Sequence, residues 1–338
     1  MKTKLTINDI ARLANVSKKT VSRVINESPR VRSETRERIK AIIAEHDFSP
    51  DLQARALAFR RSFLVAMIYD NPSPQYVVNM QRGILDTLED TSFQLVVRPC
   101  DRNAPRFYEA MQAFLEQQRL FGAILPPSVS EDEKVTELLR SVNCPYVRIA
   151  SVVLDEPDRM IWTHDAEGAA QAARHIAKLG HTRIAHIRGP DMFRSSHERL
   201  RGFELGLAEH DLTLAPDMVV EGGYTFDSGV ECARLLLAKP DRPTAIFAGN
   251  DEMALGIYQA AREMKLRVPY DISVVGFDDT PIASRISPTL TTVQLPIREM
   301  GKSAAEMLLA PPDAPKPTEP ISFMPKIVVR ESTAKLAK

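Results

Sequence analysis

From residue 63 onward, short apolar runs alternate with stretches of helical periodicity, and this alternation constrains the fold more than any other feature. The apolar runs, each followed by polar or turn residues, are 63–69, 94–97, 123–125, 146–150, 184–187, 245–248 and 273–277. The helical stretches between them include 77–91, 106–118, 168–179, 199–209 and 251–264. Strands that alternate with helices predict parallel sheets covered by helices on both faces. The number of units suits two lobes better than one sheet, so we expect a two-lobed α/β core.

The first 61 residues have a different pattern, that of short helices alone. An amphipathic helix is predicted after Thr6, which forms a capping-box pattern with Asp9. Ser17 is a favourable N-cap for a second helix, whose buried stripe contains Val21, Val24 and Ile25. A third helix is predicted to begin near Ser33 and to end before Pro50, which can itself start a short fourth helix.

Charge is distributed unevenly between these two parts of the chain. Residues 1–61 contain 14 Lys+Arg and 7 Asp+Glu, a net charge of +7. Because the whole chain has a net charge of zero, the other 277 residues carry −7. A basic segment joined to an acidic body is suited to attract phosphates at one end of the molecule.

Several classes of protein are disfavoured by the sequence. No apolar run is long enough for a membrane span, and the N-terminus is polar where a signal peptide needs an apolar stretch, so we expect a cytoplasmic protein. The three cysteines are widely spaced, which predicts buried thiols and neither a disulfide framework nor a metal knuckle. The histidines lack paired metal-ligand spacing, and we expect no metal site, cofactor or catalytic residue.

The second predicted helix has a face of hydrogen-bond donors opposite its apolar stripe. The residues on this face are Lys18, Lys19, Ser22, Arg23 and Asn26. A helix with basic and uncharged donors, placed after a tight turn, is suited to lie in a DNA major groove. An ordinary solvated helix face is the alternative that spacing alone leaves open.

A resemblance to a known family extends this interpretation. The segment TINDIARLANVSKKTVSRVIN, residues 6–26, closely resembles the headpiece signature of the lactose/galactose repressor (LacI/GalR) family, and the likeness continues through 31–36 and 48–50 to a hinge at Ala54 and Leu57. The resemblance implies a bacterial transcriptional regulator, expected to be a repressor, that binds a palindromic double-stranded DNA operator as a homodimer or higher oligomer. The DNA-binding residues expected from it are Thr6, Ser17, Lys18, Lys19, Thr20, Ser22, Arg23, Asn26, Ala54 and Leu57.

The resemblance also implies how the hinge binds DNA. Hinge helices of two family members pair in the minor groove, where a leucine from each enters the central base step, and Leu57 occupies that place beside Ala54. An inserted apolar side chain unstacks the step and bends the duplex. Asp51 departs from the Asn that is usual in the family. Simple core packing is the alternative role for Leu57.

The core contains segments that resemble the family's ligand site. Arg199 begins the segment RLRGF, Asn250 lies in GNDEMALG, and Asp278 lies in VGFDD. The resemblance implies that these three side chains bind a small effector, expected to be a sugar or sugar derivative, with Tyr224 against its apolar face. The last two of the three follow predicted strands, where ligands of parallel sheets bind. A surface ion pair for Arg199 and a helix N-cap role for Asp251 are the alternatives.

Other parts of the predicted pocket are less well marked. Tyr76 and Asp165 are further candidates for ligand contact, and Glu167 lies in the same segment as Asp165. The loop 70–76 departs from the family pattern of paired phenylalanines, so the identity of the effector stays open.

These patterns together predict a domain order. We expect an all-α helix-turn-helix headpiece at 1–49, a hinge helix and linker at 50–62, and a core at 63–338 like the periplasmic binding proteins. Its N-lobe is expected at about 63–161 and 293–322 and its C-lobe at about 162–292 and 323–338. A sugar-binding transport protein and a cytoplasmic sugar enzyme are the alternative functions. The headpiece argues against the first, and the lack of a phosphate-binding glycine loop argues against the second.

Overall fold

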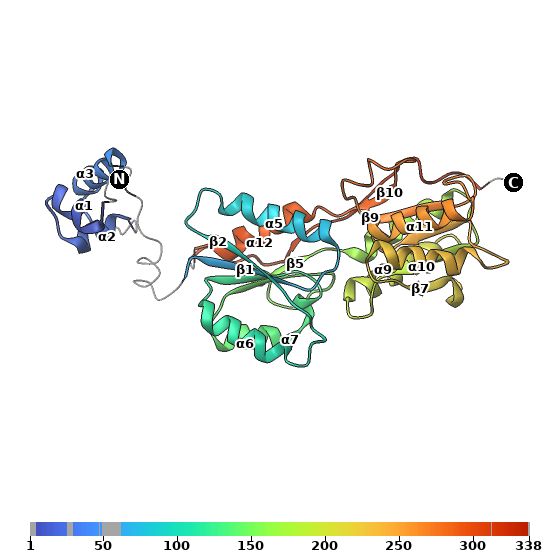
Figure 1. Ribbon diagram of the computed structural model, residues 1–338, viewed down its shortest axis with the longest axis horizontal. Coiled ribbons are helices and arrows are strands. Elements are labelled where there is room, and N and C mark those ends of the chain that lie inside the picture. Colours follow the sequence, from blue (N-terminus) through green and yellow to red (C-terminus); the bar gives the residue numbers. More distant parts are fainter. Residues whose placement is uncertain (1–4, 26–29, 47, 49–61, 312, 337–338) are drawn as a thin grey trace. The chain divides into compact units, whose positions relative to one another are not determined.

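The computed structural model describes residues 5–25, 30–46, 48, 62–311 and 313–336 and divides into two compact units, Met1–Phe63 and Leu64–Lys338. The first unit contains helices α1 (Ile7–Leu13), α2 (Lys18–Ile25) and α3 (Ser33–Glu45) (Figure 1). These are the three helices predicted from the sequence. Their buried core consists of Ile10, Ala11, Ala14, Val21, Val24, Ile39 and Phe48.

Short side-chain caps fix where the first two helices begin. The Thr6 N–H donates to Asp9 Oδ2 at 2.9 Å, and the Thr6 hydroxyl donates to the same oxygen at 2.7 Å. Ser17 Oγ accepts from the Thr20 N–H at 3.1 Å, at the start of α2. Both starts were predicted, because capping side chains act within one helical turn. The predicted fourth helix lies outside the described residues.

The second unit has an N-terminal lobe, the N-lobe, built on a parallel sheet in the order β11-β5-β4-β3-β1-β2. Its strands are β1 (Leu64–Tyr69), β2 (Gln94–Pro99), β3 (Gly122–Leu125), β4 (Tyr146–Ala150), β5 (Met160–Trp162) and β11 (Ile321–Ser322). Its helices are α5 (Pro74–Leu88), α6 (Phe107–Gln118), α7 (Glu133–Ser141) and α12 (Ile297–Leu309). Helices α5 and α12 pack together on one face of the sheet, and α6 and α7 cover the other (Figure 1).

The C-terminal lobe, the C-lobe, repeats this plan with the order β12-β10-β9-β8-β6-β7, in which only the β10–β12 pair is antiparallel. Its strands are β6 (Ile184–Arg188), β7 (Val219–Glu221), β8 (Ala245–Ala248), β9 (Ser273–Asp278), β10 (Thr291–Gln294) and β12 (Lys326–Val328). Its helices are α8 (Asp165–Lys178), α9 (Arg194–Ala208), α10 (Phe226–Leu237) and α11 (Asp251–Glu263). The predicted fold class, a helical headpiece followed by a two-lobed α/β core, is therefore confirmed.

Alternate residues of the central strands bury their side chains in different cores. In β1, Val65 and Met67 join the core under α5 and α12, whereas Ala66 and Ile68 join the core under α6 and α7. Successive side chains of a strand point to opposite faces, so a strand covered on both sides reads as one continuous apolar run. This is why the central strands were visible in the sequence.

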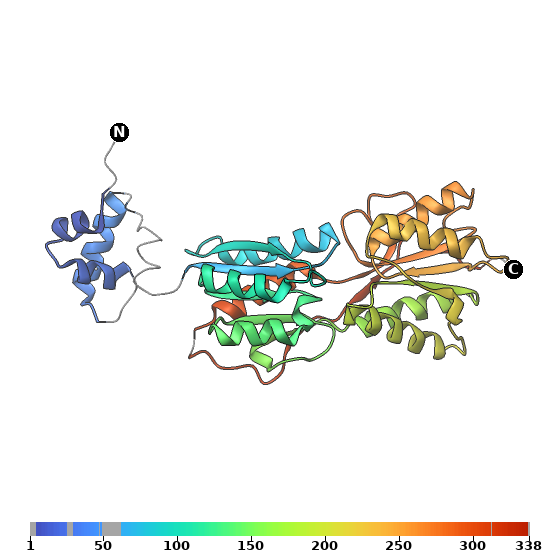
Figure 2. The ribbon, with the colours of Figure 1, turned by 60° about the horizontal axis from the view of Figure 1, so that its bottom comes forward.

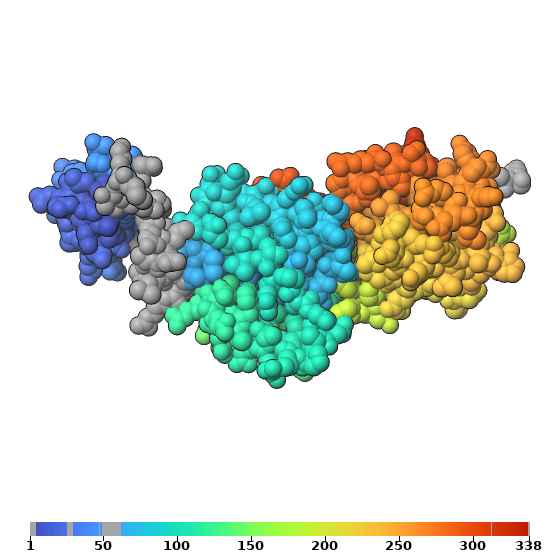
Figure 3. All heavy atoms as spheres, viewed as in Figure 1, coloured from blue at the N-terminus to red at the C-terminus, as the bar shows by residue number. Residues whose placement is uncertain are grey.

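Three connections join the two lobes. They follow β5, follow β10 and link β11 to β12, and the β5–β11 and β10–β12 pairs place them next to one another (Figure 2). On the face shown in Figure 3 the N-lobe, in cyan and green, and the C-lobe, in yellow and orange, meet directly. None of the described helices is long and apolar enough to cross a membrane.

All seven predicted apolar runs are strands, but five further strands were missed. These are β5, β7, β10, β11 and β12, which have two to four residues each. Helices α7, α10 and α12 were also missed. Strands this short contain too few residues to show a period, and most of them lie at the sheet edges or at the connections between lobes.

Candidate DNA-binding face and effector pocket

Helix α2 presents its predicted donor face to solvent. Ser17, Lys18 and Lys19 are exposed, Ser22 and Arg23 are partly exposed, and the opposite face buries Val21 and Val24 in the core of the first unit. The helix is therefore held by its apolar side while its basic side stays available for phosphates and base edges.

The remaining predicted DNA-binding residues do not lie on the exposed donor face of α2 that the structure describes. Thr6 and Thr20 take part in the helix caps, and Thr20 is only partly exposed. Asn26, Ala54 and Leu57 lie outside the described residues, so their predicted roles stay predictions.

The second unit contains a pocket between its two lobes. Its lining residues are Asn71, Ser73, Tyr76, Pro127, Thr163, Asp165, Phe193, Ser195, Arg199, Tyr224, Asn250, Asp278 and Leu295. Most of them follow the carboxyl ends of strands or begin the next helix, which is where ligands of open parallel sheets bind. All six predicted ligand residues are among them, so the structure brings these residues together. Glu167 is not among them; it forms an ion pair with Arg174 instead.

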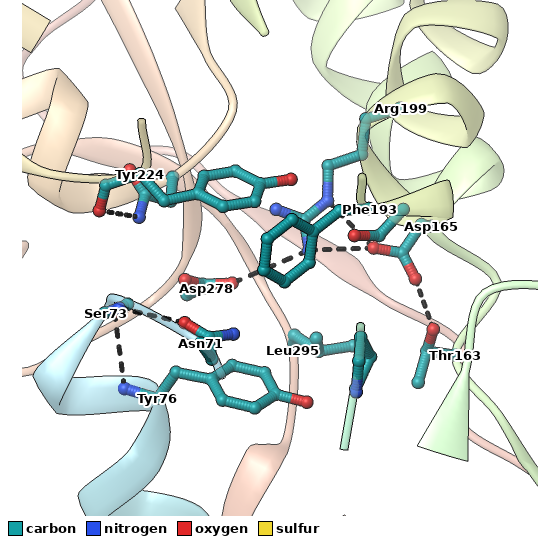
Figure 4. Close-up of a pocket in the computed structure, with 13 residues that line it drawn as sticks. Asn71, Ser73, Tyr76, Thr163, Asp165, Phe193, Arg199, Tyr224, Asp278 and Leu295 are labelled. Atoms are coloured by element: carbon teal, nitrogen blue, oxygen red, sulfur yellow. Dashed lines mark hydrogen bonds and ion pairs between the residues drawn. The ribbon is translucent and has the colours of Figure 1, made fainter. Parts of the chain in front are cut away.

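Arg199 and Asp165 form the charged centre of the pocket (Figure 4). The Nε and Nη2 atoms of Arg199 each lie 2.8 Å from Asp165 Oδ1, and its Nη1 donates to the Gly249 carbonyl. The guanidinium lies over the Phe277 ring, with Cζ 3.7 Å from the ring centroid. Arg199 is 5% exposed, so the alternative of a surface ion pair is wrong. A pair buried in this way holds the guanidinium in one orientation.

Three other polar groups among the described pocket residues lack hydrogen-bond partners. Tyr76 Oη, Tyr224 Oη and Asp278 Oδ1 are buried and have no hydrogen-bond partner in the structure, and Asp278 Oδ1 lies 3.9 Å from Arg199 Nη2. Burial raises the pKa of Asp278 well above its usual range, although the nearby guanidinium opposes this effect. Buried polar groups are almost always hydrogen-bonded, so these three atoms are the ones most suited to receive a ligand.

Asp251 holds the turn that follows Asp278. Asp278 and Asp279 have φ angles of 108° and 54°, which are costly for residues other than glycine. Asp251 accepts from the N–H and hydroxyl of Thr280, at 2.6 and 2.9 Å, and from the hydroxyl of Thr292 at 2.6 Å. These bonds fix the turn after β9 and thereby direct Asp278 into the pocket. Asp251 thus does more than begin a helix.

Tyr224 and Asn250 are linked on the C-lobe side. The Asn250 side-chain amide donates to the Tyr224 carbonyl at 3.0 Å, and its oxygen accepts from the Met253 N–H at 2.9 Å, which caps α11. The rings of Tyr224 and Tyr76 lie on opposite sides of the pocket (Figure 4). The space within the pocket in this arrangement of the lobes has a volume of about 20 Å³, room for about one water molecule. A larger ligand needs more room than this arrangement provides.

Comparisons with known proteins agree with this arrangement. Residues 6–51 match the bacterial regulatory proteins of the lacI family, and residues 173–333 match a periplasmic binding protein-like domain. The ribose operon repressor of Escherichia coli (strain K12) is 31% identical over 304 residues, which cover 90% of this chain and 92% of the relative. The chain belongs to the lacI family. It is a DNA-binding transcriptional regulator.

Solved structures of transcriptional regulators are similar over nearly the whole chain. The lac repressor dimer bound to operator and the anti-inducer ONPF has a TM-score of 0.80 and 29% identity, with 98% of this chain and all of that chain covered. A complex of the transcriptional regulator CelR with cellobiose has a TM-score of 0.72 and 29% identity, with 97% and 99% covered.

Several pocket residues of this lacI-family protein were not predicted. Thr163 and Leu295 follow β5 and β10, two strands that the sequence did not reveal. Phe193 and Ser195 lie at the start of α9, which begins five residues before the predicted position 199. Asn71 was also missed, although the sequence offered a signal for it. It comes two residues after the end of the predicted strand 63–69, where polar residues of parallel sheets often contact ligands.

Proposed function

We propose that the protein is a transcriptional repressor that binds a palindromic operator as a homodimer and that a small sugar-like effector controls it. The observation that carries this proposal is the combination, in one lacI-family chain, of an exposed donor face on α2 with a closed pocket that contains unpartnered polar groups. In this proposal the protein acts in the cytoplasm, where its DNA lies, and is not an enzyme. Because one α2 helix is too short to specify a long site, two headpieces would each bind one half-site.

The linker and strand β1 connect the two proposed functions. Residues 50–62 would form the hinge, in which Leu57 enters the minor groove beside Ala54. Strand β1 starts at Leu64, directly after the linker, and its carboxyl end leads to Asn71 and Ser73 in the pocket wall. A movement of the lobes around an effector would thus reach the linker through one strand. The effector can bias DNA binding only through its different affinities for the two arrangements of the lobes, typically by about 5- to 150-fold.

DNA binding is tested by selecting a palindromic operator from random sequences and comparing variants in gel shifts. We expect the protein to prefer the selected DNA by at least about 1,000-fold over random DNA, with an affinity that falls steeply as salt rises. Lys19→Ala should weaken specific binding more than Lys40→Ala, which removes the same charge from an exposed position on α3. Equal affinity for selected and random DNA would contradict the proposal.

The effector site is tested by Arg199→Ala. Removal of the guanidinium leaves Asp165 buried without its partner, so we expect the effector response to be lost while operator affinity without effector stays within about 3-fold of wild type. Arg201→Ala is the control, because Arg201 lies on the same helix with a side chain that is 58% exposed. Calorimetry that showed unchanged effector binding in Arg199→Ala would place the effector elsewhere.

A further inference from the structure

The charges inside the pocket indicate what kind of effector it can accept. Among the described residues that line the pocket, Arg199 alone carries a positive charge, whereas Asp165 and Asp278 bring two carboxyl groups. Both carboxyl side chains are at least nine-tenths buried, with exposures of 2% and 5%. Charges at this depth are weakly screened by solvent, so their balance affects every ligand that enters.

The single positive charge is already engaged within the protein. Asp165 Oδ1 lies 2.8 Å from both Nε and Nη2 of Arg199, Nη1 donates to the Gly249 carbonyl, and the Phe277 ring covers one face of the guanidinium. An anionic ligand would have to displace Asp165 from this pair. That exchange would leave a buried carboxylate without its partner, which is costly.

A third carboxyl group, that of Glu131, lies close to the pocket. Glu131 reaches from the N-lobe to the C-lobe, where its Oε2 accepts from the Arg194 N–H at 3.0 Å, while its Oε1 is buried without a partner. Burial, with a contribution from the nearby Asp165, raises the pKa of Glu131 to about 7 against the opposing effects of Arg194 and Arg102. Neither of these two arginines is among the described residues that line the pocket.

The unpartnered atoms point to a ligand that brings hydroxyl groups. Asp278 Oδ1 can accept a hydrogen bond, and the Tyr76 hydroxyl can donate one. The two lie in the same closed pocket, together with the Tyr224 ring, which can pack against an apolar sugar face. A ligand hydroxyl group between them can donate a hydrogen bond to Asp278 Oδ1 and accept one from the Tyr76 hydroxyl, and it adds no charge to the pocket.

We propose that the effector is a polyhydroxylated molecule without a negative charge and that this pocket excludes uronates, aldonates and sugar phosphates. This inference rests on the proposed effector site. A carboxylate or phosphate in this pocket would lose its hydration without gaining a free cation. Beside Asp278 it would either meet a like charge or require that carboxyl group to take up a proton. Two like charges about 4 Å apart in such surroundings are expected to lower affinity on the order of 100-fold or more.

The test uses the full chain and matched ligand sets, each with a neutral sugar, its uronate and its phosphate, such as glucose, glucuronate and glucose 6-phosphate. A thermal-shift screen identifies the sets that stabilise the protein, and calorimetry measures each member of the best set. We expect the neutral member to bind best and the anionic members to bind at least about 100-fold more weakly. An anionic ligand that binds as well as its neutral counterpart overturns the inference but leaves the effector site. A screen in which no set stabilises the protein overturns the proposed sugar-like effector instead.

A variant distinguishes charge from shape. Asp278→Asn keeps the size of the side chain and removes its charge, so we expect weaker binding of the neutral sugar and at least a 10-fold smaller discrimination against its uronate. Asp227→Asn removes the same charge from an exposed position at the start of α10 and should leave discrimination unchanged. Unchanged discrimination in Asp278→Asn would show that the charge of Asp278 does not select the effector.

Discussion

At the scale of single residues, Gly189 makes room for the Tyr224 ring. A Cβ at position 189 would lie 2.0 Å from Tyr224 Cζ and 2.4 Å from its Oη, far closer than atoms can approach. Tyr224 itself has a φ of 57°, a left-handed backbone conformation that is uncommon for residues other than glycine. The position of this aromatic ring thus depends on the absence of a side chain at position 189, directly after the neighbouring strand β6.

Gly189→Ala is expected to displace the Tyr224 ring and to weaken effector binding by about 10-fold, the usual value of one well-packed aromatic contact. Operator binding without effector should be unchanged. Gly223→Ala is the matched control, because a Cβ there meets Ser228 atoms only at 3.5 and 3.6 Å, which is ordinary contact. Calorimetry measures both variants, and equal affinities would show that Tyr224 does not contact the effector.

At the scale of helices, close packing of α8 and α9 brings Arg199 to Asp165. A Cβ at Gly202 would lie 1.9 Å from the Ala166 carbonyl oxygen, and one at Gly206 would lie 2.6 Å from the Ala170 carbonyl oxygen. The two helices therefore pack backbone against backbone where they cross. Arg199 lies about one turn before Gly202 on α9, and Asp165 is the first residue of α8.

Gly202→Ala should separate the two helices and lower the free energy of unfolding by about 1 to 3 kcal/mol, as overpacking of a core does. Because Arg199 would move away from Asp165, we also expect weaker effector binding. The loss of affinity should be larger than the lower fraction of folded protein can account for. Leu205→Ala, on the exposed face of α9, should change stability by less than about 0.5 kcal/mol. Urea unfolding and calorimetry give the two quantities, and a Gly202→Ala protein as stable as wild type would contradict the packing argument.

At the scale of the whole second unit, Glu131 connects the two lobes. Its carboxylate lies in the N-lobe and accepts from the first N–H of α9 in the C-lobe, where Phe193 provides no side-chain cap. This contact can exist only while the lobes are closed, so it should favour the closed arrangement.

Closure is therefore expected to depend on pH. The pKa of Glu131 is raised by burial to about 7 when the lobes are closed, whereas an exposed Glu has its usual value of 4.5. The closed arrangement holds the proton more tightly, so this contribution to closure is complete below about pH 4.5 and is lost as the pH rises through 7. The raised pKa of Asp278 acts in the same direction.

Hydrogen exchange of the first turn of α9 measures this closure. We expect protection, corrected for the intrinsic rate, to fall between pH 5 and pH 8, the range that the pKa of about 7 defines. Glu131→Gln keeps an acceptor and should show a smaller pH dependence, while Glu131→Ala should lose protection at every pH. Glu137→Gln, at an exposed position of α7, is the charge-matched control. A pH dependence in Glu131→Gln equal to that of wild type would assign the effect to another group.

The sequence by itself determined those structural features that depend on interactions between neighbouring residues. The caps at Thr6 and Ser17 and the apolar runs of the central strands act over a few residues, so helices α1 and α2 and strands such as β1 and β8 were predictable. The ligand candidates were found through resemblance to a family and not through spacing.

Only the tertiary structure decided how distant residues meet. Arg199 pairs with Asp165 across 34 positions because glycines let α8 and α9 approach, and Glu131 caps α9 across 63 positions because the lobes close. Short strands such as β5 and β10 form because their neighbours in the sheets provide backbone partners. The pattern of neighbouring residues does not predict these contacts. Their free energy comes from burying surfaces of distant segments against each other, and these surfaces meet only in the folded chain.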